Sequence, residues 1–191
     1  MGEGRRAVTL RGRLLAAAHA LLAASVFAMP SVGAPAQEYQ LKAVFLFQFA
    51  QFVEWPSSSF ASPEMPFEFC VLGEDPFGSF LEETVRDENV KGRALTIRRH
   101  RQPEELQGCN ILFISRSQMD RLDTILAAVR GRSTLTVADA QAFAERGGAI
   151  QFVTVNNKLR LRINPNAAKA ADLVISSKLL SLADIVNGQG P

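Results

Sequence analysis

The chain has 191 residues, with 21 lysines and arginines against 19 aspartates and glutamates. Four arginines and one glutamate lie within residues 1–36, so the remaining 155 residues carry 17 basic and 18 acidic side chains. This balance gives no support for nucleic-acid binding, which needs a basic stripe, and 155 residues is the length of one domain.

The N-terminal segment has the three parts of a secretory signal peptide. Arginines precede an apolar run from Leu14 to Met29, and Ala34-Pro35-Ala36 then fits an A-x-A cleavage site before Gln37. The alternative is an uncleaved membrane anchor, but a run of about 16 apolar residues falls short of the ~20 that span a bilayer. We therefore predict a signal peptide over residues 1–36, cleaved near Ala36, and one domain over 37–191 that works outside the cytoplasm.

The first element of this domain is predicted to be a helix from Gln37 to Val53. Nearly all of its later positions are apolar, so the helix must be covered on more than one side. Pro56 ends the helical pattern. Trp55, beside Glu54, is the only tryptophan. It either anchors a binding partner, as tryptophan often does, or staples the helix to the sheet.

Apolar runs bounded by turn residues predict the strands. We expect them at Phe67–Leu72, Ala94–Arg99, Asn110–Ser115 and Ser133–Ala138, with a hairpin at Ala149–Val155 and Lys158–Ile163. The hairpin turn is Asn156-Asn157, because asparagine tolerates the left-handed conformation that a two-residue turn needs.

Helical segments are predicted between these strands. They are Pro76 to about Val85 with Asp75 as N-cap, Gln118–Arg130 ending at Gly131, a short helix from Asp139 to near Gly147-Gly148, and a long helix from Asn166 to about Val186. The alternation predicts an α/β fold of three layers. Its sheet is expected to be mostly parallel, with about six strands, an antiparallel C-terminal hairpin at its edge and flanking helices.

The two cysteines, Cys70 and Cys109, are expected to form a disulfide in an oxidising compartment. Their strands are neighbours in a flavodoxin-like 2-1-3 order, where the Cα atoms fall near the ~5.5–6 Å that a disulfide needs. Two free buried thiols are the alternative.

The sequence offers little for catalysis. His100 is the only histidine after residue 36, and its arginine neighbours indicate a solvated strand end and a poor base. One histidine without a Cys-x-x-Cys pair does not build a zinc site of the usual kinds. Nucleophile-elbow, Walker and G-x-G-x-x-G motifs are missing from the sequence. We therefore expect no enzymatic activity, no cofactor and no metal.

A binding function is better supported, because open α/β sheets bind ligands beyond the carboxyl ends of parallel strands. The candidates at those ends are Gly73, Asp75, Phe77, Gly78, Ser115, Ser117 and Asp139. Asp75, Ser117 and Asp139 are alternatively plain helix caps. Glu54, Trp55 and Lys178 are further candidates for partner contact, although Lys178 is equally explained as part of an exposed helix face.

Several segments together resemble the YfiR family of small periplasmic proteins. The most specific are the helix segment ending in EWP, the turn LGEDPFG and the segment ISSKLL. The full set, in chain order, is Tyr39–Pro56, Phe69–Gly78, Cys109–Ser115, Leu135–Asp139, Phe143–Phe152, Leu161–Ala168 and Ile175–Ala183. The resemblance covers almost the whole chain after residue 36.

This resemblance implies a non-enzymatic repressor, acting as a homodimer. Its implied partner is the periplasmic part of an inner-membrane diguanylate cyclase or sensor protein, and an outer-membrane peptidoglycan-binding lipoprotein can sequester it. Some relatives have a second cysteine pair around the glycine pair, but Ala144–Gly148 contains none, so any redox sensing must use Cys70 and Cys109. The alternative functions are a small-ligand sensor and an accessory factor for another envelope system.

Overall fold

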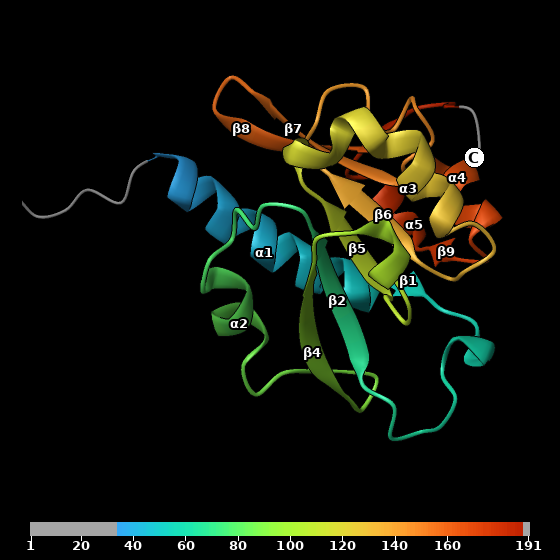
Figure 1. The fold of residues 1–191 in the computed structure, drawn as a ribbon. Helices are drawn as coiled ribbons and strands as arrows, with labels where there is room; N and C mark the ends of the chain where they lie inside the picture. The colour runs from blue at the N-terminus through green and yellow to red at the C-terminus, as the bar shows by residue number, and fades with distance from the viewer. Residues whose placement is uncertain (1–33, 189–191) are drawn as a thin grey trace, which may run out of the picture. The chain divides into compact units, whose positions relative to one another are not determined.

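The main sheet consists of short runs of apolar, β-branched and aromatic residues within residues 34–188, the part of the chain that the computed structural model describes (Figure 1). Its eight strands lie in the order β10-β8-β7-β6-β5-β2-β4-β3, and five of the seven neighbouring pairs are parallel. The strands are β2 (Phe67–Leu72), β3 (Asn89–Val90), β4 (Arg93–His100), β5 (Ile111–Ile114), β6 (Leu135–Ala138), β7 (Ile150–Val155), β8 (Lys158–Ile163) and β10 (Asp184–Ile185).

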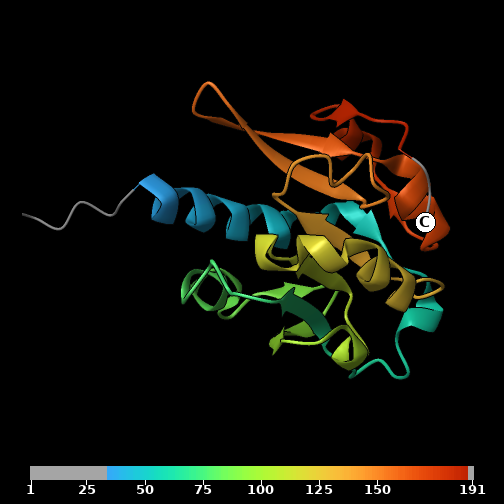
Figure 2. The same ribbon diagram turned by 45° about the horizontal axis from the view of Figure 1, so that its top comes forward.

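Helices cover both faces of this sheet, which confirms the predicted three layers (Figures 1 and 2). Alternate residues of β2 belong to different cores: Phe69 and Val71 pack with helix α1 (Ala34–Phe52), whereas Cys70 and Leu72 pack with helix α3 (Leu122–Ala128). This alternation follows from the two-residue period of a strand. The smaller helices are α2 (Phe80–Val85), α4 (Pro165–Ala170) and α5 (Ser177–Leu180).

The predicted hairpin is confirmed, with Asn156 and Asn157 both at positive φ (50° and 58°) between β7 and β8. The 2-1-3 order is also confirmed, since β2 lies between β4 and β5. Among the described residues, no helix combines the length and the apolar character that crossing a bilayer demands. The predicted signal peptide falls almost entirely outside these residues and stays a prediction.

Helix α1 is less completely covered than its composition predicts. Phe49 is fully buried, but Leu41 and Val44 are 45% and 42% exposed. The helix ends at Phe52, before Pro56, because the next two residues form strand β1 (Val53–Glu54).

The predictions of a helix from Pro76 after β2 and of a helix from Asp139 after β6 are wrong. Helix α2 begins at Phe80, four residues after Pro76, and its N-cap is Ser79. The segment after Asp139 forms turns instead of a helix. Asp139 does not cap a helix because its carboxylate is already bound by a lysine, a tyrosine and an arginine side chain.

The prediction of one long C-terminal helix from Asn166 to about Val186 is also wrong. Asn164 caps α4, and Asp172, at a φ of 56°, ends this helical segment in the left-handed conformation. The chain then forms β9 (Val174–Ile175), which pairs antiparallel with β1. Ser176 starts the four-residue α5 by accepting a hydrogen bond from Leu179 N–H at 3.3 Å. Lys178 therefore lies in a short helix, not in the middle of a long one.

The aromatic contact between α1 and the sheet predicts a large effect of truncation. The Phe49 ring stacks on Phe152 with 5.7 Å between centroids. We expect Phe49→Ala to lower the free energy of unfolding by about 3–5 kcal/mol, because it leaves a cavity. Val44→Ala, on the exposed side of the same helix, is the control and should change it by less than about 0.5 kcal/mol. Urea denaturation measures both, and equal losses would contradict this packing.

Candidate functional site

The strands β2, β5 and β6 end at one edge of the sheet, as expected for parallel strands. Their last residues are in register, so Gly73, Ser115 and Asp139, which follow them, lie at that edge. Ser117 Oγ lies 3.3 Å from Ser115 Oγ and accepts a hydrogen bond from the Glu74 N–H at 3.1 Å. The chain leaves β2 for β4 on one side and later returns to β5 on the other, so this edge is a topological switch point.

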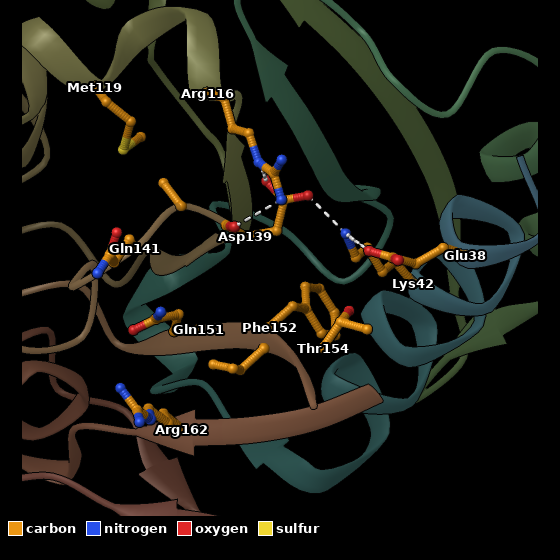
Figure 3. Close-up of a pocket in the computed structure, with 12 residues that line it drawn as sticks. Glu38, Lys42, Arg116, Met119, Asp139, Gln141, Gln151, Phe152, Thr154 and Arg162 are labelled. Carbon is orange, nitrogen blue, oxygen red and sulfur yellow. Dashed lines mark hydrogen bonds and ion pairs between the residues drawn. The ribbon is translucent and has the colours of Figure 1, made fainter. Parts of the chain in front are cut away.

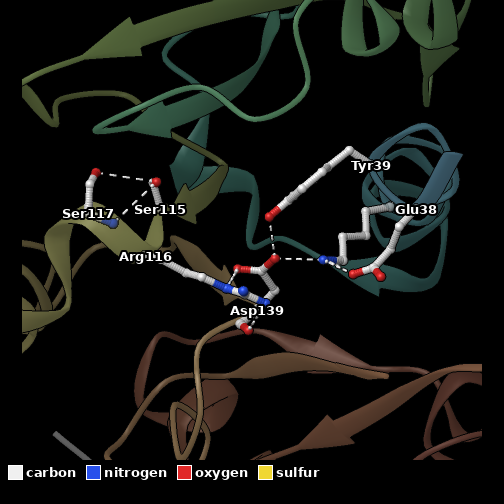
Figure 4. Close-up of polar contacts among 7 residues, drawn as sticks. Glu38, Tyr39, Ser115, Arg116, Ser117 and Asp139 are labelled. Carbon is white, nitrogen blue, oxygen red and sulfur yellow. Dashed lines mark hydrogen bonds and ion pairs between the residues drawn. The ribbon is translucent and has the colours of Figure 1, made fainter. Parts of the chain in front are cut away.

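Asp139 is the centre of a buried polar cluster at this edge (Figure 4). Its Oδ2 accepts hydrogen bonds from Lys42 Nζ at 2.6 Å and from the Tyr39 hydroxyl at 2.7 Å. Its Oδ1 accepts one from Arg116 Nε at 3.1 Å. The side chains of Lys42 and Asp139 are only 1% and 2% exposed, so this ion pair is removed from water.

The cluster shifts the acidity of two of its members. Burial alone raises the pKa of Asp139, but the hydrogen bonds from Lys42 and Tyr39 outweigh burial and leave this pKa below its ordinary value. Burial, followed by the hydrogen bond to Asp139, raises the pKa of the Tyr39 phenol. At neutral pH the carboxylate is therefore an acceptor and the phenol a donor.

Helix α1 supplies the other half of the cluster from its first turns. Glu38 lies one helical turn before Lys42, and its Oε1 is 2.5 Å from Lys42 Nζ. The same ammonium group lies 4.2 Å from the centroid of the Tyr39 ring, which is a cation–π distance. None of these residues, nor Arg116, was identified from the sequence. The available signal was that Lys42 is the only charged residue between Glu38 and Glu54.

A groove of about 710 Å³ opens beside the cluster (Figure 3). Arg116, Asp139 and Lys42 form one wall, and side chains of β7 and β8, including Phe152 and Arg162, form the other. The Arg116 side chain is 65% exposed, and its guanidinium group donates from Nε to the Asp139 carboxylate and from Nη2 to the Asp139 backbone carbonyl. The groove has the size of a small-molecule site and offers cationic, anionic and apolar groups.

The turn after β2 places three predicted residues in structural roles. Asp75 Oδ1 accepts a hydrogen bond from the Phe77 N–H at 2.8 Å, and its Oδ2 pairs with Arg99 Nε at 2.6 Å. The Gly78 carbonyl accepts a bond from Arg99 Nη2 at 3.1 Å. Phe77 is 1% exposed and packs edge-on against Phe113. Asp75 therefore stabilises this turn and does not cap a helix at Pro76.

Glu54, Trp55 and Lys178 lie near the C-terminal end of α1 and do not join the strand-end cluster. Glu54 is exposed on β1. The Trp55 ring packs edge-on against Phe67 of β2 at 4.8 Å, which agrees with a staple between helix and sheet. Lys178 Nζ lies 5.3 Å from the Phe52 ring.

The expected disulfide between Cys70 and Cys109 is present, with 5.7 Å between the Cα atoms. It lies in the core beneath α3, where both residues are buried. His100 is also buried, at 9% exposure, so its interpretation as a solvated strand end is wrong. Strand alternation points His100 to the opposite face from Arg99, which precedes it in β4.

Together these features define a small α/β domain with a disulfide in one core and a charged groove at a switch point of its sheet. The model of the YfiR/HmsC-like family matches residues 39–184, and the chain belongs to this family. Membership indicates a regulatory protein of the periplasm. No curated protein matches the chain.

The buried ion pair predicts that Asp139 is essential for stability. We expect Asp139→Asn to lower the free energy of unfolding by about 3 kcal/mol or more, because it removes the buried one of the two carboxylates that pair with the Lys42 ammonium. The control is Asp123→Asn, since Asp123 is 88% exposed and pairs with Arg146 at 3.3 Å. A surface pair of this kind contributes less than about 1 kcal/mol. Chemical denaturation at pH 7 compares the two variants.

The same variants give a pH test. The pKa of Asp139 is lower in the folded protein than in the unfolded chain, where it is about 3.9. Its contribution is therefore complete above that value and is lost as the pH falls through the folded pKa. The difference in stability between wild type and Asp139→Asn should shrink over this acidic range, and a constant difference would contradict the ion pair.

Proposed function

We propose that this protein is a non-enzymatic periplasmic regulator that represses an inner-membrane diguanylate cyclase by binding its periplasmic part. The observation that carries the proposal is the family match over residues 39–184, which includes nearly all of the described domain. The homodimer and the sequestering outer-membrane lipoprotein, both implied by the sequence resemblance, belong to the same proposal.

Arg116 is the side chain best prepared for contact with a protein partner. Its guanidinium group is fixed by two hydrogen bonds to Asp139, yet most of the side chain faces solvent. Fixing the side chain beforehand lowers the conformational entropy lost on binding. Arginine is also among the residues that dominate binding hot spots. We therefore place the partner contact at the rim of the groove, around Arg116.

A deletion strain tests the repression. Loss of the gene should raise cyclic-di-GMP, and a plasmid copy of the wild-type protein should restore the low level. Wild-type protein should also capture a membrane diguanylate cyclase from solubilised envelopes. We expect Arg116→Ala to weaken this binding about 30-fold, which corresponds to a hot-spot loss of about 2 kcal/mol, and to restore repression poorly.

Arg146→Ala is the matched control for Arg116→Ala. Arg146 is 43% exposed, pairs with Asp123 on the surface and does not line the groove. This variant should bind and repress like wild type. An unchanged cyclic-di-GMP level in the deletion strain, with no cyclase captured, would contradict the proposal. Equal behaviour of the two arginine variants would contradict only the position of the contact.

The groove favours a second candidate function, a receptor for a small periplasmic ligand. Its two exposed arginines, Arg116 and Arg162, together with the Phe152 ring, suit an anionic molecule with an apolar part. Asp75 and Ser117 were the residues expected to bind such a ligand. Asp75 is instead paired with Arg99, and Ser117 is bonded to the backbone of Glu74.

Calorimetry separates this candidate from the first. Wild-type protein is titrated with sets of nucleotides, amino acids and organic-acid cofactors. A ligand with micromolar affinity that binds wild type and Arg146→Ala, but binds Arg116→Ala at least tenfold more weakly, would support a receptor. Absence of binding across these classes, with a cyclase captured from envelopes, would reject it.

A further inference from the structure

The single histidine after residue 36 lies beside the disulfide. A ring nitrogen of His100 and the sulfur atoms of Cys70 and Cys109 all lie within 4.8 Å of one another, and all three residues are buried. They come from three adjacent strands, because β2 carries Cys70 while His100 ends β4 on one side and Cys109 precedes β5 on the other. Their closeness is a product of the fold and not of sequence spacing.

The two ring nitrogens of the His100 imidazole have different surroundings. Its Nδ1 lies 3.6 Å from the Glu105 carboxylate, whereas its Nε2 is buried without a hydrogen-bond partner. A buried polar atom without a partner is unfavourable and uncommon in folded proteins. In metal-binding histidines the second ring nitrogen donates to a carboxylate, and Glu105 lies close enough to Nδ1 for a small movement to form that hydrogen bond.

We propose that reduction of the Cys70–Cys109 disulfide creates a buried metal site, with two thiolates and His100 Nε2 as ligands. The site would take one thiophilic d¹⁰ ion, Zn²⁺ or Cu⁺, because thiolate and imidazole are the ligands that these ions prefer. Sequence spacing did not indicate the site, since zinc motifs rely on closely spaced cysteines and histidines, and these ligands are 30 and 9 residues apart along the chain.

The chemistry balances with a dithiol as the reductant. The disulfide accepts two electrons and two protons from the dithiol, which itself becomes a disulfide, and two protein thiols result. Binding of Zn²⁺ then releases both thiol protons to solvent, and neutral His100 contributes the lone pair of Nε2. The two thiolates cancel the charge of Zn²⁺. The fourth coordination position is left to water.

The geometry requires only a small closure. Zinc–sulfur bonds of about 2.3 Å and zinc–nitrogen bonds of about 2.0–2.1 Å place tetrahedral ligand atoms roughly 3.6–3.8 Å apart. The present cluster lies within 4.8 Å. The nitrogen therefore moves by about 1 Å toward sulfurs that have separated on reduction, which side-chain rotation within the core can supply.

Cobalt(II) is the probe for the zinc arm, because tetrahedral thiolate coordination gives it strong near-ultraviolet and visible absorption. The full chain is expressed for export, purified without a polyhistidine tag and reduced with a dithiol. We expect one Co²⁺ per chain with tetrahedral bands, displaced by Zn²⁺, and no such bands from the oxidised protein. Competition with a Cu⁺-specific chelator measures the affinity of the reduced protein for Cu⁺. Tight one-to-one binding of either ion supports the proposal.

Neighbouring glutamates provide a matched pair of variants. Glu105→Gln removes the carboxylate that lies beside His100 Nδ1 and should weaken binding about tenfold. Glu104→Gln, at a side chain that is 73% exposed, should leave affinity unchanged. His100→Asn should weaken binding more than Glu105→Gln. The Cys70→Ser/Cys109→Ser variant reports any metal that is bound elsewhere on the chain.

Three results would overturn the proposal. The first is reduced wild-type protein that binds neither ion stoichiometrically. The second is His100→Asn that binds as tightly as wild type, with its oxidised form shown to be folded by circular dichroism. The third is a reduced chain that has lost its secondary structure and does not regain it when the metal is added.

Discussion

The buried ion pair between Lys42 and Asp139 is the constraint on which the strand-end site depends. Removing two charges from water costs several kcal/mol for each ion, and only close pairing with further hydrogen bonds offsets that cost. Tyr39 and Arg116 supply those bonds to Asp139, and Glu38 supplies a second carboxylate to Lys42. The first turns of α1 and the end of β6 are therefore fixed to each other.

This constraint also explains the position of the groove. Arg116 follows β5, and Asp139 holds its guanidinium group through both the carboxylate and the backbone carbonyl. The guanidinium therefore stands at the rim in one orientation. The opposite wall is built on the hairpin, where Phe152 stacks on Phe49 of α1. Both walls therefore contact α1, one through Lys42 and the other through Phe49. The width of the groove thus depends on how α1 packs on the sheet.

The sequence predicted those parts of the fold that short-range rules determine. The Asn156-Asn157 turn selects the hairpin register, and apolar runs identify the parallel strands. The C-terminal segment was mistaken for one helix because its alanines fit a helical period. That period does not reveal a left-handed residue at Asp172 or the pairing of β9 with β1, which depends on a segment about 120 residues earlier.

The candidate site divides in the same way. Topology alone predicted that Gly73, Ser115 and Asp139 meet at one edge. It did not predict which side chains from α1 reach that edge, because helix placement depends on the packed core. The error at His100 had a different cause. Charge along the sequence suggested a solvated position, whereas the two-residue period of β4 turns Arg99 to the other face and His100 toward the core.

The disulfide core and the strand-end groove are connected by a short path through the backbone. The carbonyl of His100 accepts a hydrogen bond from the Gly73 N–H at 2.9 Å, at the point where β2 gives way to the strand-end turn. Gly73 has a φ of +93°, and a Cβ there would lie 2.6 Å from Ser117 Oγ. This turn therefore packs too closely against Ser117 to accept a side chain at position 73. The next residue, Glu74, donates its backbone N–H to Ser117 Oγ at 3.1 Å, and Ser117 adjoins Arg116 along the chain. The disulfide and the rim of the groove are therefore joined by a continuous set of contacts, and Cys70 and Gly73 are only three residues apart along β2 and its turn.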